Sequence, residues 1–80
     1  MSNYRFTWYF VFRVQPKRPQ LRPQWCIRVV EDPIRKEVQA DGRLRFWGFV
    51  PELGGRPLRV ITLADGETIH NAFPDRSFKP

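Results

Sequence analysis

Two Asp-Gly pairs constrain the fold of this 80-residue chain most strongly, because each separates two segments rich in β-forming residues. Asp65-Gly66 stands between LRVITL and TIHNAF, and Asp41-Gly42 stands between IRKEVQA and LRFWGFV. A two-residue type I′ hairpin turn needs positive φ at both central positions, which Asp-Gly tolerates. The second half of the chain is therefore predicted to form a meander of four antiparallel strands.

Helical signals occupy the first part of the chain. Pro23 suits a first helical position, and it opens a segment with a helical stripe of apolar residues, Trp25, Cys26, Val29 and Val30. Residues 4–14 fit neither helical nor strand periodicity, and the prolines of 15–23 predict a basic loop. The predicted fold is one α+β domain over residues 1–80, with one or two N-terminal helices packed on the four-stranded meander.

The second hairpin predicts which side chains share a face of the sheet. With a two-residue turn, Ile61 lies opposite His70, and Arg59 lies opposite Ala72. His70 and Arg59 then share the face that the helix does not cover. The covered face is predicted to carry an apolar set: Leu58, Val60, Ile69 and Phe73.

All of the net charge of +6 belongs to the first 30 residues, which hold six cations and no acid. Most cations of the chain are arginine, whose planar fork matches phosphate or carboxylate. This pattern predicts a phosphate-bearing or acidic partner, with a solvated basic face as the alternative. The predicted nucleic-acid contacts of this part are Arg13, Lys17, Arg18 and Arg22.

The chain has one cysteine and one histidine, which limits the chemistry that it can perform. One cysteine, Cys26, excludes an internal disulfide, and one Cys with one His falls short of the usual zinc ligand sets. Cys26 is predicted to be a small buried apolar residue. We expect no metal and no cofactor. The apolar run FTWYFVF is far shorter than the ~20 residues that cross a bilayer, so we expect a cytoplasmic protein without a membrane partner.

Four segments resemble a family of small bacterial proteins of unknown function that is grouped with the RelE and BrnT type toxins of toxin–antitoxin systems: FTWYFVFRV, WCIRVVEDP, EVQADGRLRFWGFVPELGG and LRVITLADGETIHNAFPDRSFK. The resemblance implies a RelE-like fold with helices on one face of a curved antiparallel sheet, and it makes residues 6–14 a helix against their propensity. It also implies metal-free cleavage of messenger RNA, in some members at the ribosome, and neutralisation by a cognate antitoxin. Between Phe6 and Arg13, the family commonly has a histidine where this chain has Tyr9.

Metal-free RNA cleavage requires deprotonation of the 2′-hydroxyl, protonation of the leaving oxygen and stabilisation of the charged phosphorane. His70 has an ordinary pKa near neutrality, and Arg59 on the same face can hold a phosphate with two nitrogens. The Tyr9 hydroxyl can serve as an acid. The predicted catalytic residues of a metal-independent endoribonuclease are His70, Arg59, Arg76 and Tyr9.

Further RNA contacts are predicted on the open sheet face and after the last strand, at Arg45, Trp47 and Lys79. Two alternatives remain. A non-enzymatic module would bind an acidic protein through exposed aromatics and arginines, and the absence of the family histidine at Tyr9 favours it. A structural subunit would form a homo-oligomer, with Trp47 and Phe49 buried between copies.

Overall fold

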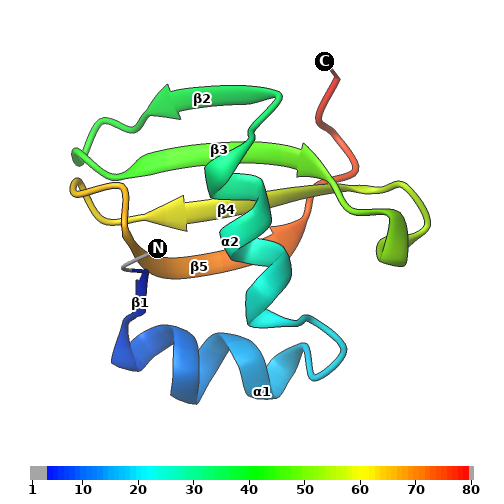
Figure 1. Ribbon diagram of the computed structural model, residues 1–80. Helices are drawn as coiled ribbons and strands as arrows, with labels where there is room; N and C mark the ends of the chain where they lie inside the picture. Colours follow the sequence, from blue (N-terminus) through cyan, green and yellow to red (C-terminus); the bar gives the residue numbers. More distant parts are fainter. Residues whose placement is uncertain (1–3, 80) are drawn as a thin grey trace.

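The structure of the protein, a computed structural model, describes residues 4–79 (Figure 1). A five-stranded sheet has the order β1-β5-β4-β3-β2. The strands are β1 (Arg5–Phe6), β2 (Arg35–Val38), β3 (Leu44–Phe49), β4 (Pro57–Thr62) and β5 (Thr68–Pro74). The helical segments are η1 (Phe10–Val14), α1 (Gln15–Lys17), α2 (Pro23–Glu31) and η2 (Pro51–Leu53). Helix α2 crosses one face of the sheet, and the helix formed by η1 and α1 lies beside β5 (Figure 1).

The α+β class is confirmed, but the sheet has five strands and is mixed rather than four-stranded and antiparallel. Strand β1 pairs in parallel with β5, placing Arg5 opposite Thr68 and Phe6 opposite Ile69. The remaining neighbours in the sheet pair antiparallel. A strand of two residues is too short to show any periodicity in the sequence, which is why β1 was missed.

The first helix runs through a π-helical segment. Residues 8–17 are helical, and in η1 the Gln15 N–H bonds to the Phe10 carbonyl five residues back. The expectation of a helix over residues 6–14 is confirmed for residues 8–14, whereas Phe6 belongs to β1 and the helix continues into the predicted loop. Pro16 lies one residue beyond the π segment, in the first turn of α1, a position that tolerates proline.

Helix α2 carries the core as its apolar stripe predicts. Trp25, Cys26, Val29 and Val30 are all buried, and they pack over β3 and β4 together with Phe10 and Val14 of the first helix. The approach to β3 is close, because a Cβ added at Gly48 would lie 3.2 Å from Val29 Cγ2. Burial of this apolar face is the main stabilising contribution of α2.

A β-bulge changes the predicted register of the last hairpin. Thr62 pairs with Ile69, but the next pair is Ile61 with Asn71, so His70 is the extra residue. The register was predicted correctly only on the turn side of the bulge. Beyond it Ala72 is buried opposite Val60, and Phe73 lies opposite Arg59 on the other face. The prediction of Phe73 beneath the helix was therefore wrong.

Both Asp-Gly pairs lie in turns, but only the glycines have positive φ: 89° at Gly42 and 69° at Gly66. Asp65 instead accepts hydrogen bonds from the backbone N–H groups of Glu67 and Thr68. The type I′ prediction for Asp65-Gly66 was wrong, because Asp65 remains at negative φ and its side chain holds the turn.

Candidate nucleic-acid interface

A hollow of about 350 Å³ lies between the first helix and β5. Its wall combines three cations with polar and apolar groups: Tyr9, Arg13, Val14, Lys17, Arg18, Asn71 and Phe73. Within residues 4–79, no carboxylate lines it. We call it the basic hollow. It is suited to an anionic group lying against an aromatic surface.

The first helix places three of these side chains on one face. Tyr9, Arg13 and Lys17 recur every four residues, so they lie along one side of residues 8–17. Arg18 follows directly, with its guanidinium carbon 6.0 Å from the ring centre of Phe73. The structure thus brings together four residues that sequence reasoning had selected separately, three as nucleic-acid contacts and Tyr9 as a catalytic group.

Sequence reasoning missed the wall that β5 contributes, Asn71 and Phe73. Their place depends on the bulge at His70, which turns Phe73 away from α2. The Asn71 Oδ1 atom accepts the backbone N–H of Ala72 at 2.8 Å, which leaves the amide nitrogen as the group that can donate to a ligand. Phe73 also lies 5.0 Å from the guanidinium carbon of Arg59.

His70 contacts the first helix at the rim of the basic hollow. Its ring stacks on Tyr9 with centroids 4.9 Å apart, and its Nδ1 lies 3.0 Å from Thr7 Oγ1. Thr7 Oγ1 also accepts the Phe10 N–H, so its own proton is available for Nδ1 of a neutral imidazole. Burial, followed by the nearby charge of Arg43, lowers the pKa of His70. This lowering of the pKa favours the neutral imidazole.

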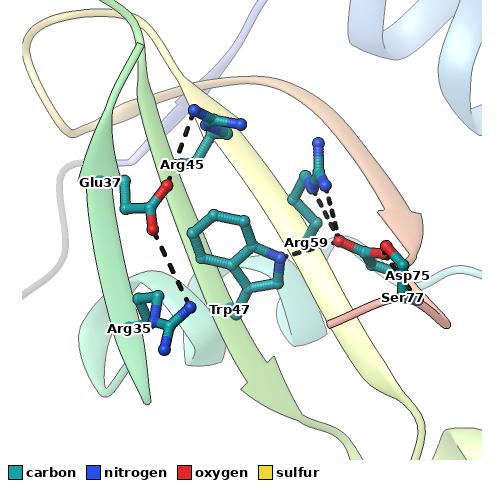
Figure 2. Close-up of polar contacts among 7 residues, drawn as sticks. All are labelled: Arg35, Glu37, Arg45, Trp47, Arg59, Asp75 and Ser77. Carbon is teal, nitrogen blue, oxygen red and sulfur yellow. Dashed lines mark hydrogen bonds and ion pairs between the residues drawn. The ribbon is translucent and has the colours of Figure 1, made fainter. Parts of the chain in front are cut away.

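Arg59 is engaged by Asp75 rather than facing the basic hollow as an unpaired cation. Its Nε and Nη2 donate to Asp75 Oδ2 at 3.0 and 2.7 Å, and Trp47 Nε1 donates to the same oxygen at 3.0 Å (Figure 2). The other oxygen accepts the backbone N–H and the hydroxyl of Ser77. These bonds, led by those of Ser77 and Trp47, hold the pKa of Asp75 far below its ordinary value. His70 lies at the bulge, whereas Arg59 pairs with Phe73 farther along β4.

Arg45 and Trp47 lie on the same open face as Arg59, as expected (Figure 2). The Arg45 guanidinium carbon is 5.7 Å from the Trp47 ring, and its Nη2 is 3.6 Å from a Glu37 oxygen. Trp47 is only 4% exposed, because Phe78 stacks on it with ring centroids 5.2 Å apart. In this state Trp47 cannot stack on a ligand.

The remaining predicted contacts lie outside the basic hollow. Arg22, Arg76 and Lys79 are exposed and do not line it. In the described part of the chain, no cluster of three or more His, Cys, Asp or Glu side chains is placed to hold a metal. Cys26 is buried, and burial raises the pKa of its thiol to about 12. Among residues 4–79, no helix is long and apolar enough to cross a membrane.

Comparison of the chain with protein-family models, with curated proteins and with solved structures finds no match. The resemblance to the RelE and BrnT type toxins therefore stays a hypothesis. A function is therefore proposed from the geometry of the basic hollow and of the open face.

Proposed function

We propose that the protein binds single-stranded RNA through the basic hollow. The observation that carries this proposal is the gathering of Arg13, Lys17 and Arg18 around one aromatic side chain, Phe73, with no carboxylate among the described lining residues. Phosphates of a bound strand meet the cations, and an unpaired base meets the planar surfaces of Phe73 and Arg18.

RNA is proposed in preference to other anionic partners for two reasons. A hollow beside an aromatic ring suits an unpaired base, whereas the stacked bases of a duplex present only their edges. The resemblance to RelE and BrnT type toxins, with a RelE-like fold, adds messenger RNA as the substrate class. On this proposal the protein is a toxin-type RNA-binding domain of a type II toxin–antitoxin system.

The geometry supports RNA binding better than RNA cleavage. His70 Nδ1 is engaged by the Thr7 hydroxyl, and Arg59 is neutralised by Asp75, so neither is poised as the base or the phosphate clamp of the expected mechanism. Tyr9 is the member of the predicted catalytic set that lines the basic hollow. Its hydroxyl can donate a hydrogen bond to a phosphate oxygen.

The test is fluorescence anisotropy with a labelled mixed-sequence single-stranded RNA. The Arg13→Ala/Lys17→Ala variant is expected to bind about 25-fold more weakly at 0.1 M salt. This factor assumes that each of the two lost phosphate contacts changes the slope of log K against log salt concentration by ~0.7. The matched control, Lys36→Ala/Arg56→Ala, removes the same residue types from exposed positions away from the basic hollow. Equal losses in both variants would show non-specific attraction and refute the site.

Cleavage is tested in the same preparation. Labelled RNA is incubated with the protein in EDTA, beside Tyr9→Phe and His70→Ala. Intact RNA with retained binding identifies a binding module. Cleavage that is lost in Tyr9→Phe identifies a metal-independent endoribonuclease, and translating ribosomes are the second substrate to test.

A second candidate function, binding of an acidic protein partner such as a cognate antitoxin, is favoured by the outer face of the first helix. Trp8 is 65% exposed and Phe12 is 59% exposed, their rings lie 5.2 Å apart, and Val11 is exposed beside them. Arg13 lies 5.9 Å from the Trp8 ring, so the apolar face has a basic border. Trp8→Ala/Phe12→Ala should abolish binding of such a partner and leave RNA binding intact. Self-association that this variant abolishes would instead identify a homo-oligomer.

A further inference from the structure

The most buried aromatic of the open sheet face is Trp47. Open-face positions of a sheet are normally solvated, yet Trp47 is 4% exposed. The cover is the ring of Phe78, which lies at 11° to the indole with centroids 5.2 Å apart. That arrangement is a parallel stack of two planar groups, which is also how a nucleobase lies on an aromatic side chain.

The surroundings of Trp47 favour a nucleic-acid base over a protein side chain. Arg45 and Arg59 lie 5.7 and 5.3 Å from its ring, and Arg35 lies 5.2 Å from the ring of Phe78. The carboxylates nearby are already paired, Asp75 with Arg59 and Glu37 with Arg45. The Arg45 Nε atom is buried and has no hydrogen-bond partner among the described residues.

The segment that carries Phe78 is anchored at Asp75, and Phe78 itself makes a different set of contacts. Asp75 is fixed by Arg59, Trp47 and its own N–H bond to the Pro57 carbonyl. Beyond Asp75, Phe78 is held by its N–H bond to the Asp75 carbonyl at 3.3 Å and by contacts with Trp47 and Arg35. The ring can therefore leave Trp47 while the ion pair beneath it stays intact.

The Trp47 position lies next to the basic hollow along the sheet. Arg59 contacts both Trp47 and Phe73, and Phe73 lines the basic hollow. Since β3 and β5 are separated by β4, the two aromatic positions are about 10 Å apart across the sheet. One unstacked strand is long enough to place a base at each position.

We propose that Trp47 is a second base-stacking site, occupied in the free protein by Phe78 and taken by an unpaired base when RNA binds. This inference rests on the proposed RNA binding at the basic hollow. It adds a defined second site, and it makes the C-terminal segment a competitor of the RNA. Removal of the Phe78 ring should then strengthen binding of strands long enough to reach Trp47.

The test compares Phe78→Ala with Phe49→Ala, another phenylalanine of the open face, which is exposed. Anisotropy is measured with a labelled hexanucleotide, and a mononucleotide that fills only the basic hollow is the short ligand. Phe78→Ala is expected to bind the hexanucleotide about fivefold more tightly, the equilibrium equivalent of one aromatic pair. The mononucleotide affinity and the Phe49→Ala variant should stay at wild-type values.

The experiment distinguishes failure of the Trp47 site from failure of the proposed RNA binding. In the first case, the wild type binds RNA, Arg13→Ala/Lys17→Ala does not, and Phe78→Ala binds the hexanucleotide no more tightly than the wild type. The Trp47 site is then refuted, and the basic hollow stands. If neither the wild type nor Phe78→Ala binds RNA, the proposed function and this inference fall together. Equal tightening for the mononucleotide would also overturn the inference, because one nucleotide cannot span the basic hollow and Trp47, so the gain would not come from a strand that occupies both.

Discussion

Replacing Asp75 by asparagine should unfold the protein far more readily than its position near the C-terminus suggests. The Asp75 side chain is 7% exposed, and its oxygens accept bonds from Arg59, Trp47 and Ser77. Asparagine keeps the shape of the Asp75 side chain but removes its negative charge. It also replaces one of the two acceptor oxygens by an N–H₂ group, which faces hydrogen-bond donors and cannot accept from them. Breaking a buried ion pair costs 3–5 kcal/mol in general, and we expect about 3 kcal/mol because Arg59, at 24% exposure, still reaches water.

The assay is thermal unfolding followed by circular dichroism. A loss of about 3 kcal/mol should lower Tm by roughly 12 to 24 °C in a domain of this size. Glu67→Gln is the control, since it removes an exposed ion pair with Arg5 at 3.7 Å, and it should change stability by less than about 1 kcal/mol. The wild type should also lose this contribution in acid. The pKa of Asp75 is lowered in the folded state, so its stabilisation is complete above the ordinary value of 3.8 and is lost as the pH falls below it. Equal Tm values for Asp75→Asn and Glu67→Gln would refute the reasoning.

Two further predictions concern His70 and Gly48. The pKa of His70 is lowered below its ordinary value of 6.5 in the folded state, so the wild type should lose stability as the pH falls below 6.5, and His70→Gln should flatten that dependence in melts from pH 7.5 to 5. Gly48→Ala places a Cβ 3.2 Å from Val29 Cγ2 and should cost about 1 kcal/mol by urea unfolding. The cost should shrink in a Val29→Ala background, and an unchanged cost there would rule out this contact as the cause.

Local signals in the sequence were sufficient for part of the fold. The stripe that begins at Trp25 predicted the buried face of α2, because i, i+1, i+4, i+5 spacing is decided within a few residues. The Asp-Gly pairs correctly marked two turns, although their backbone conformation was assigned wrongly. Residues 8–17 are helical despite their aromatic content, since burial of Phe10 and Val14 outweighs their local propensity.

The features that shape the site depend on pairing between distant segments. Strand β1 exists only because residues 5 and 6 meet β5, more than sixty residues later. The bulge at His70 was hidden because Ile69 can be buried with either Ala72 or Phe73, and the sequence IHNAF fits both registers. Burial of Ile69 with Ala72 puts Phe73 in the basic hollow. Burial of Ile69 with Phe73 would instead place Phe73 under α2. The ion pair of Arg59 with Asp75 depends on the same register, so the sequence did not predict it either.

The sequence singled out the basic residues but did not predict how they are arranged. Arg13, Lys17 and Arg18 stood out because the first 30 residues hold no acid. That they gather with Tyr9 along one helical face required knowing that residues 8–17 are a helix. Arg22, Arg76 and Lys79 carry the same charge but lie outside the basic hollow, and composition alone does not separate the two groups.

The salt dependence of RNA binding tests the central proposal most directly. For single strands, the slope of log K against log salt concentration changes by about 0.7 for each phosphate contact. The account predicts that Arg13→Ala/Lys17→Ala reduces the magnitude of the wild-type slope by about 1.4, while Lys36→Ala/Arg56→Ala leaves it unchanged. Identical slopes for the wild type and Arg13→Ala/Lys17→Ala would show that the basic hollow does not hold the RNA backbone, and would contradict the account.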